Sequence, residues 1–431
     1  MRILFLTDNY LPERNAPATR TAEHAAAWAA AGHEVEVITT APNFPEGKLF
    51  AGYRNAWSQR ETIDGVSVHR VKTFITANEG FVRRTLDYVS FMASGAAAAL
   101  LARRPDVVIT TSPQFFCAMA GWLVTRLRRV PWIFELRDLW PESIVAVGAM
   151  KRGRVIRWLE RLEVRMYVDA DAIVSVTEAF RFDLIQRGIS PEKIHVVLNG
   201  VDMRRYAPQP KDAGWLARHD LHGKFVVGYL GTHGMAHALD KVVEAAALLA
   251  HRPDIVFLFA GAGAKRAEVE ARLAALGLRN VRLIESQPKS EMPGLWSVHD
   301  LALIPLRDQP LFTTVIPSKM FEALGMGVPI LMSLPEGEAT QLLRTTDAGV
   351  TVPPEDPAAM AAAIEALADD PARVLAMRVA AAEAAPRFSR GEMAQRMLQV
   401  ITGTVREGVP SAVSAGSPGV PAAGDGTVPP L

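Results

Sequence analysis

Short apolar runs with strand character alternate along this chain with longer stretches of helical periodicity. This spacing predicts parallel strands joined by crossover helices, as in a doubly wound α/β sheet. Apolar residues are nearly continuous within the runs, as at residues 107–109, which is typical of strands covered on both faces. In the first half the expected strands are residues 2–7, 34–39, 106–111, 131–136 and 172–176, with helices near 19–32, 81–103, 115–129 and 152–168.

The same alternation starts again after residue 224, with strands expected at 225–229, 255–260, 281–284, 301–305 and 328–332. A chain of 431 residues is also too long for one ordinary core. We therefore predict two facing Rossmann-like doubly wound domains with a cleft between them. Such sheets bind ligands at the carboxyl ends of their strands, and two facing domains would place those ends across the cleft. The predicted division is residues 1–195, 196–386, a helix over 387–407 that packs back toward the first domain, and a disordered tail over 408–431.

Charge and hydropathy exclude several classes of protein. The formal net charge is +1, so no nucleic-acid partner is expected. The single cysteine, Cys117, allows no internal disulfide and fits a reducing compartment. No apolar run reaches the roughly 18–20 residues of a membrane span, which predicts a cytoplasmic protein. Basic clusters before residue 170 leave two alternatives open: solvated helix surfaces, or peripheral contact with the inner surface of an anionic membrane.

A glycine-containing turn over residues 228–234 follows one of the expected strands. Gly231 and Gly234 let the backbone approach a ligand closely, and free amides at the start of the next helix favour an anion. An ordinary tight turn explains the same pattern equally well. His233 and His237 lie on this turn and are candidates to meet a phosphate.

The segment over residues 317–330 carries the strongest signal. Ser318 suits the N-cap of a helix, Lys319 lies in its first turn, and Glu322 follows one turn later on the same side. A lysine at a helix start opposes the helix dipole, and a bound anion there gives a reason for it. The ionised carboxylate of Glu322 suits two neighbouring hydroxyls, such as those of a ribose. A surface helix with a Lys–Glu pair is the alternative.

This segment is one of several that occur in a fixed order, the others being residues 8–13 with Arg20, 32–35, 42–47, 135–143 and 199–202. Together they resemble a family 4 glycosyltransferase of the two-domain GT-B type. The chain is most similar to the bacterial branch that builds O-antigen, capsule and colanic acid-like polysaccharides, including the WbuB-type fucosamine transferases. The resemblance covers nearly all of the chain before the tail.

The resemblance implies a retaining glycosyltransferase that uses a nucleotide sugar, with UDP favoured. Amides around Ser318 and Lys319 would approach the diphosphate, and Glu322 would hold the ribose. No metal and no other cofactor are implied, because the nucleotide sugar is a substrate. The other donor-binding residues it implies are Gly231, Thr232 and Gly234 at the phosphates, Asn15 and Ala16 facing them from the first domain, and Gln287 at the base.

On the acceptor side, the resemblance implies a polyprenyl-diphosphate-linked saccharide at the inner membrane surface. Asp138 and Glu135 are the candidates to orient or deprotonate the acceptor hydroxyl, and Arg137 is the candidate to bind an acceptor phosphate. A structural role is the alternative for all three. The basic helix over residues 154–167, with its tryptophan and tyrosine, favours an acceptor held at a membrane.

Three positions depart from the family pattern. The first of its two glutamates, which contacts the transferred sugar, falls on Thr314. The N-terminal glycine pair of many relatives is Asn15–Ala16 here, and the acceptor-side His–Asp pair is Arg137–Asp138. The donor is therefore not expected to be handled as glucose is, and an N-acetylated or deoxy amino hexose is the predicted sugar.

Two further patterns are weak. The turn over residues 261–263 matches half of a dinucleotide fingerprint, and close strand–helix packing explains it equally well. The Asp-Ala-Asp run at 169–171 resembles a metal–nucleotide motif of another glycosyltransferase fold, but its place between a helix and a strand favours capping or a turn. No Cys/His cluster has the spacing of metal ligands.

Two other functions remain open. A UDP-N-acetylhexosamine 2-epimerase on the same fold would interconvert free UDP-sugars without a lipid acceptor. A non-catalytic nucleotide-sugar-binding assembly protein is conceivable because the first glutamate of the motif is missing.

Overall fold

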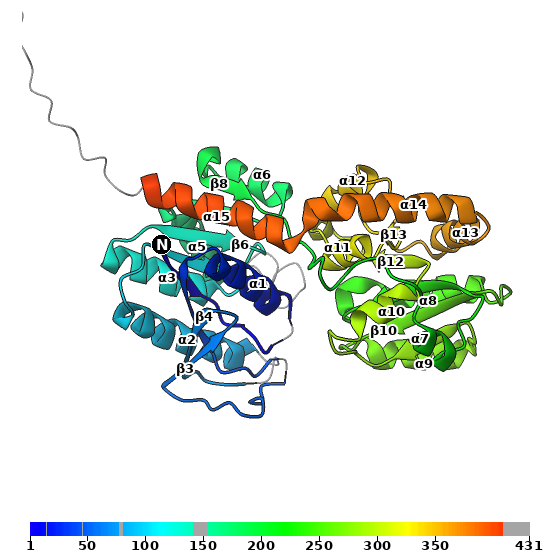
Figure 1. The fold of residues 1–431 in the computed structure, drawn as a ribbon, viewed down its shortest axis with the longest axis horizontal. Coiled ribbons are helices and arrows are strands. Elements are labelled where there is room, and N and C mark those ends of the chain that lie inside the picture. The colour runs from blue at the N-terminus through cyan, green and yellow to red at the C-terminus, as the bar shows by residue number, and fades with distance from the viewer. Residues whose placement is uncertain (14, 45, 77–80, 141–152, 408–431) are drawn as a thin grey trace, which may run out of the picture.

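The computed structural model of the protein describes residues 1–13, 15–44, 46–76, 81–140 and 153–407. Within them the chain forms two α/β lobes that lie side by side, each built on its own sheet (Figure 1). The predicted pair of parallel α/β sheets is confirmed. The predicted disordered tail and the end of the 135–143 motif lie outside the described residues.

The first lobe contains an eight-stranded sheet in which every neighbouring pair is parallel except β3 and β4. The strands that the sequence predicted occupy its centre. In spatial order the sheet consists of β3 (Ser58–Ile63), β4 (Val66–Val71), β2 (Glu34–Thr40), β1 (Arg2–Leu6), β5 (Val107–Thr111), β6 (Trp132–Leu136), β7 (Ala172–Ser175) and β8 (Ile194–Val196).

Helices cover both faces of this sheet because alternate strand residues point to opposite sides. Ile3 and Phe5 belong to a core shared with α1 (Ala16–Ala30) and α15 (Arg390–Glu407). Leu4 and Leu6 face the other way. The helices on that second face are α2 (Phe81–Leu101), α3 (Phe115–Arg128) and α5 (Arg154–Asp169), followed at the sheet edge by α6 (Glu178–Gln186) and η1 (Pro191–Lys193).

The sequence did not predict the hairpin of β3 and β4. The strand β3 reads Ser-Gln-Arg-Glu-Thr-Ile, so it lacks the apolar run that marks the central strands. It forms because Asp64 and Gly65 both adopt positive φ angles, which join two antiparallel strands tightly. An edge strand of this kind can stay polar because only one of its neighbours is a strand.

The second lobe contains a six-stranded sheet whose pairs are all parallel. Its order is β11 (Val281–Ile284), β10 (Ile255–Ala260), β9 (Phe225–Leu230), β12 (Leu301–Pro305), β13 (Ile330–Ser333) and β14 (Gly349–Val352). One face packs on α8 (Leu239–Leu248), α9 (Arg266–Leu276), α13 (Pro357–Ala368) and α14 (Pro371–Ala384). The other face packs on α7 (Ala213–Arg218), α10 (Met292–Ser297), α11 (Ser318–Gly325) and α12 (Glu338–Arg344).

The last helix leaves the second lobe and lies on the first. After η4 (Ala385–Phe388), α15 runs along α1, where the indole Nε1 of Trp28 donates to the carbonyl oxygen of Ala394 at 2.9 Å. Met393, Met397 and Ile401 are fully buried in the first lobe's core. The segments that cross between the lobes pair through a bridge of Val201 and Ser389. The predicted boundaries at residues 195 and 386 remain predictions.

Candidate active site

A cavity of about 190 Å³ lies where the two lobes meet. It is larger than a site for a few waters, and charged side chains line it from both sides. The first lobe contributes α1, and the second contributes α11 and the loop before α10. The two segments that cross between the lobes also line the cavity, the first with residues 201–206 and the second with Arg390. Its lining residues are Ala16, Thr19, Glu23, Val201, Asp202, Arg205, Tyr206, Lys289, Ser318, Glu322 and Arg390.

Glu322 lines this cavity from the second turn of α11. The indole Nε1 of Trp296 donates to its Oε2 at 3.2 Å, which fixes the carboxylate. Burial raises the pKa of Glu322, although Trp296 and the cations Arg390 and Lys289 oppose the rise. The carboxylate is therefore held in place with acceptor capacity left for a ligand.

Lys319 lies one turn earlier, and its ammonium is buried without a hydrogen-bond partner among the described residues. Its Nζ lies 4.0 Å from the centroid of the Tyr229 ring. A Cβ at Gly231 would come within 3.1 Å of that Nζ, so the glycine keeps the ammonium's surroundings open. Burial lowers the pKa of Lys319 to about 7.

The start of α11 differs in one respect from the sequence interpretation. Ser318 was expected to cap the helix, but Pro317 occupies the N-cap and Ser318 is the first helical residue. Proline fixes the extended backbone there and offers no side-chain acceptor. The first amides of α11 therefore lack a side-chain cap, which leaves donors at the end of the helix that lies beside the cavity.

The Gly231–Gly234 turn packs against the second glycine turn. A Cβ at Gly261 would overlap the carbonyl oxygen of Gly231, and one at Gly263 would lie 2.6 Å from the carbonyl oxygen of His233. The turn over 261–263 is thus explained by backbone packing. Thr232 is exposed, and its carbonyl oxygen accepts from the Tyr229 hydroxyl at 2.5 Å.

The two histidines of this turn are neutral at pH 7. Burial, with help from nearby cations, lowers the pKa of His233 to about 4, and burial and Lys319 lower the pKa of His237 to about 4. His233 is fully buried, so its ring lies within the packing of the turn. Neither ring supplies a positive charge for a phosphate.

From the first lobe, Asn15 and Ala16 present the start of α1. The Oδ1 of Asn15 accepts from the backbone N–H of Ala18 at 2.9 Å, and its Nδ2 donates to Oδ1 of Asn9. Asn15 therefore caps the helix, and Ala16 lines the cavity. Two side chains join the lobes nearby: Lys289 donates to the Thr19 hydroxyl, and the Glu338 carboxylate accepts from the first amides of α6 at 2.7–2.8 Å.

The three predicted acceptor-side residues lie at the end of β6, and none is among the residues that line the cavity. Glu135 is buried in an ion pair with Arg20. Arg137 is largely buried, and its Nη1 has no hydrogen-bond partner among the described atoms. The hydroxyl of Ser112 accepts from the amides of Arg137 and Asp138 and so fixes this turn. Their catalytic roles remain predictions.

Gln287 lies after β11, where its Nε2 donates to the carbonyl oxygen of Glu285 at 2.9 Å. Its role at the base also remains a prediction. Sequence reasoning missed Lys289, two residues further on, and Arg390, whose Nη1 pairs with Glu23 at 2.6 Å. Nothing in the sequence marked these cations, because they join the site only through the lobe interface.

Thr314 and the Asp-Ala-Asp run have local structural roles. The Thr314 hydroxyl donates to the carbonyl oxygen of Leu311 at the end of η3 (Pro310–Thr313). Asp169 accepts from Trp122, Arg126 and Arg165, while Asp171 accepts from the amide of Trp132. Within the described ranges, no group of three or more His, Cys, Asp or Glu side chains is placed to hold a metal ion.

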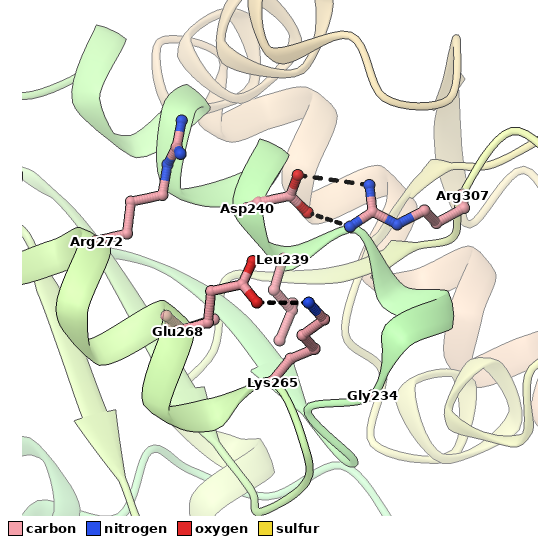
Figure 2. Close-up of a pocket in the computed structure, with 8 residues that line it drawn as sticks. Gly234, Leu239, Asp240, Lys265, Glu268, Arg272 and Arg307 are labelled. Carbon is pink, nitrogen blue, oxygen red and sulfur yellow. Dashed lines mark hydrogen bonds and ion pairs between the residues drawn. The ribbon is translucent and has the colours of Figure 1, made fainter.

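A second depression is lined by Gly234 and by residues of α8 and α9 (Figure 2). Its cations are already paired: Lys265 with Glu268 at 2.5 Å, and Arg307 with Asp240 at 2.7 Å. Its volume is about 10 Å³, which is room for about one water molecule. The interlobe cavity is therefore the better candidate for a substrate site. No helix in the described part of the chain is long and apolar enough to cross a bilayer.

Two family models and several curated proteins match the sequence of this chain. Residues 15–200 match the family described as glycosyl transferase 4-like domain, and residues 224–370 match glycosyl transferases group 1. The chain is 26% identical over 338 residues to the putative colanic acid biosynthesis glycosyl transferase WcaI of Escherichia coli K12, covering 76% of this chain and 82% of that protein. It is 27% identical over 409 residues to D-inositol 3-phosphate glycosyltransferase 1 of Catenulispora acidiphila, covering 88% and 92%.

Solved structures share the fold. HepE of Anabaena, crystallised with UDP and glucose, matches with a TM-score of 0.70 and 17% identity over 93% of this chain and 99% of its own. Sucrose-phosphate synthase of Thermosynechococcus elongatus matches with a TM-score of 0.73 and 16% identity over 94% and 99%. The predicted GT-B fold is thereby confirmed. The chain therefore belongs to the glycosyltransferases that carry a glycosyl transferase 4-like domain followed by a glycosyl transferases group 1 domain.

Proposed function

We propose that this protein transfers a sugar, with retention of configuration, from a UDP-sugar to a lipid-linked or saccharide acceptor in cell-surface polysaccharide synthesis. One observation carries the donor part of the proposal. The ammonium of Lys319 is buried next to Gly231, without a hydrogen-bond acceptor among the described residues. Lys319 itself is not among the residues that line the cavity, but its helix neighbours Ser318 and Glu322 are.

A buried ammonium without an acceptor is costly, and a diphosphate at this position would supply one. The uncapped amides at the start of α11 point to the same ligand, because a helix start favours an anion. We propose that these donors offset the charge of the departing diphosphate, with no metal taking part.

The position of Glu322 supports a ribose subsite. Its carboxylate lines the cavity one turn after Lys319 and is held by Trp296. One carboxylate can accept from the two neighbouring hydroxyls of a ribose. Diphosphate and ribose subsites one helical turn apart fit the compact spacing of these groups in a nucleotide sugar, and Gln287 is proposed to meet the base.

On the acceptor side, we assign the orienting role to Asp138. The bond from the anomeric carbon to the diphosphate oxygen breaks while the acceptor oxygen bonds to that carbon, and the acceptor's proton leaves for a nearby base. Asp138 is our candidate for that base. The largely buried Arg137, whose Nη1 has no hydrogen-bond partner among the described atoms, is the candidate to bind an acceptor phosphate.

The names of similar proteins support the finer parts of this proposal. WcaI is named for colanic acid biosynthesis, and crystals of HepE hold UDP, UDP with glucose, or UDP-glucose. The absence of a glutamate at Thr314 supports an N-acetylated or deoxy amino hexose as the transferred sugar, as expected for the WbuB-like branch.

Product analysis with a UDP-N-acetylhexosamine tests the proposal. The purified protein is incubated with this donor, with and without a polyprenyl-diphosphate saccharide, and UDP, free UDP-sugars and glycolipid are quantified. Transfer yields UDP and extended lipid in equal amounts. A new UDP-sugar without UDP release would identify an epimerase, and donor binding without any product would identify a binding protein. Calorimetry with UDP, GDP and ADP identifies the nucleotide.

A further inference from the structure

One carboxylate of the second lobe completes the start of a helix in the first. Glu338, the first residue of α12, accepts from the backbone amides of Glu178 and Ala179 at 2.8 and 2.7 Å. These two residues begin α6, and the next amide, of Phe180, donates to the hydroxyl of Thr177 at 3.1 Å. Both lobes together therefore cap the first turn of α6. We call the interlobe part of this cap the Glu338 contact; Figure 1 shows α6 and α12 on the two lobes.

The carboxylate of Glu338 lies between the starts of two helices. A helix carries a partial positive charge at its start, where its amides are free. Glu338 begins α12 and accepts from the start of α6, so its negative charge offsets both helix ends. Without the carboxylate, two helix starts would face each other across the interface with amides left unpaired. The contact therefore favours the arrangement of the lobes that the structure shows.

Within the second lobe, the turn that presents Glu338 packs on the segment leading into the donor helix α11. A Cβ at Gly337 would lie 2.1 Å from the carbonyl oxygen of Thr313, so the glycine lets this turn pack directly on the end of η3. The helix α11 follows η3 in the chain. Leu343 of α12 is buried in the same core cluster as Phe321 of α11. Glu338 is therefore fixed relative to the helix that carries the donor-binding side chains.

An apolar side chain crosses between the lobes from the same segment. Val315, between η3 and α11, is half-buried and packs against the core of the second lobe and also against a core cluster of the first. That first-lobe cluster contains Phe180 of α6, together with Leu136 and Leu139, which flank the acceptor-side turn after β6. Polar and apolar contacts thus hold the donor segment against the acceptor side of the first sheet.

The Glu338 contact lies outside the cavity, since neither Glu338 nor the start of α6 lines it. The cavity has its own interlobe contact, in which Lys289 donates to the hydroxyl of Thr19. A ligand in the cavity would meet those side chains directly. Loss of the Glu338 contact therefore changes how the lobes are held without removing a group that lines the cavity.

We propose that Glu338 is a positioning residue: its contact with α6 holds the donor helix and the acceptor side of the first sheet in one arrangement, and so sets how closely donor and acceptor meet. This inference rests on the proposed function, because it places the donor on the second lobe and the acceptor on the first. Transfer needs reacting atoms about 3–3.5 Å apart, and a misplacement of about 1 Å can slow it roughly 100-fold. The contact therefore acts on the rate of transfer and not on donor affinity.

Single-molecule fluorescence energy transfer measures the arrangement of the lobes without any substrate. Dyes are placed on Arg103→Cys in the first lobe and Arg373→Cys in the second, both at exposed positions, while the buried Cys117 should not react. Glu338→Ala should broaden the distribution of transfer efficiencies relative to wild type. Glu178→Pro should do the same, because it removes one of the two donating amides at the first helical position, which accepts proline.

Each of these variants has a matched control. Glu178→Ala keeps the amide and removes only the side chain, so it is the control for Glu178→Pro. Glu365→Ala removes a carboxylate that pairs with Arg252 inside the second lobe, so it is the control for Glu338→Ala. Neither control should broaden the distribution. Circular dichroism confirms that each variant is folded.

Kinetics separates positioning from a purely structural role. In Glu338→Ala and Glu178→Pro, kcat for transfer should fall about 10- to 100-fold. The Kd of UDP, measured by calorimetry, should stay at the wild-type value, because Lys319 and Glu322 lie together on α11.

Three outcomes would overturn the positioning role: unchanged energy transfer in Glu338→Ala and Glu178→Pro, broadening in a control, or a loss of UDP affinity as large as the loss of kcat. A wild type that binds UDP but transfers no sugar would defeat the proposed function instead. The energy-transfer result would then still decide whether Glu338 holds the lobes.

Discussion

Arg20 on α1 and Glu135 on β6 form an ion pair in which Nε lies 2.9 Å from Oε1 and both side chains are about 1% exposed. The guanidinium of Arg20 also donates to the carbonyl oxygens of Val197 and Leu198, just after β8. Burial acts to raise the pKa of Glu135, but Arg20 and Arg137 outweigh it and hold that pKa below its usual value. This arrangement joins a helix, a strand and the first interlobe crossing.

Glu135→Ala should therefore destabilise the protein more than it affects chemistry. Removing one partner of a buried pair leaves an unpaired charge, which costs about 3–5 kcal/mol. Urea unfolding should show a lower midpoint with an unchanged slope. Asp138→Asn is the control, because it should lower kcat with little change in the midpoint. A Glu135→Ala protein of wild-type stability that has lost turnover would assign Glu135 to the reaction.

Replacing Glu322 with alanine should lower kcat/KM for the donor about 100-fold. The loss corresponds to two hydrogen bonds to a charged acceptor, at about 1.5 kcal/mol each. Steady-state kinetics with the donor varied measures it. Glu336→Ala removes an exposed carboxylate that pairs with Arg344 in the same lobe, and it should leave the kinetics unchanged. Wild-type turnover by Glu322→Ala would sink the assignment of the ribose subsite.

UDP binding should weaken as the pH rises above 7. Burial lowers the pKa of Lys319 to about 7, so in the free protein the ammonium is charged below that pH and neutral above it. A bound diphosphate raises this pKa again, so binding takes up a proton and Kd should rise by up to about tenfold per pH unit. Calorimetry in two buffers of different ionisation enthalpy measures the proton uptake. Lys319→Met should bind more weakly and show no uptake, and an unchanged uptake would contradict the role of Lys319.

The same lysine should make the protein without ligand less stable. Its folded-state pKa lies below the unfolded value, so folding disfavours the protonated form. The resulting destabilisation grows as the pH falls from about 10 to 7 and is constant below 7. At pH 7, Lys319→Met should therefore have a higher Tm than wild type. At the wild-type Tm its free energy of unfolding should be greater by roughly 2 kcal/mol or more. Lys265→Met, at an exposed ion pair, is the control. A lower Tm for Lys319→Met would contradict a buried ammonium that has no hydrogen-bond partner among the described residues.

The fold could be predicted because its central strands are apolar on both faces. Residues 255–260 and 301–305 were predicted at the bounds that the structure shows, and so was the half-buried edge strand over 281–284. Polar β3 and the three-residue β8 were missed, since neither has a periodic apolar pattern long enough to detect. The Ser318 cap was wrong because an N-cap needs extended backbone, which Pro317 already provides.

From residue spacing, the site was predictable only where a single segment forms it, whereas Ala16, which lines the cavity from the first lobe, was expected only through the family resemblance. Lys319, Glu322 and Ser318 lie on one helix, so their spacing in the sequence was enough to bring them together. Lys289 and Arg390 reach the cavity from segments about 100 residues apart, and only the contact between the lobes brings them to α1. The two glycine turns, at residues 228–234 and 261–263, could be found in the sequence. Their packing against each other depends on the register of β9 and β10, which the sequence does not show.

The position of α15 sets an order on the folding of this protein during its synthesis. The first lobe is translated early, yet its core includes Met393, Met397 and Ile401 from the end of the described chain. A nascent chain that has emerged only through β8 therefore holds a sheet with an uncovered apolar strip beside Trp28. That strip stays exposed to chaperones and to other nascent chains until the ribosome has delivered the whole second lobe, so the lobe that is made first is completed last.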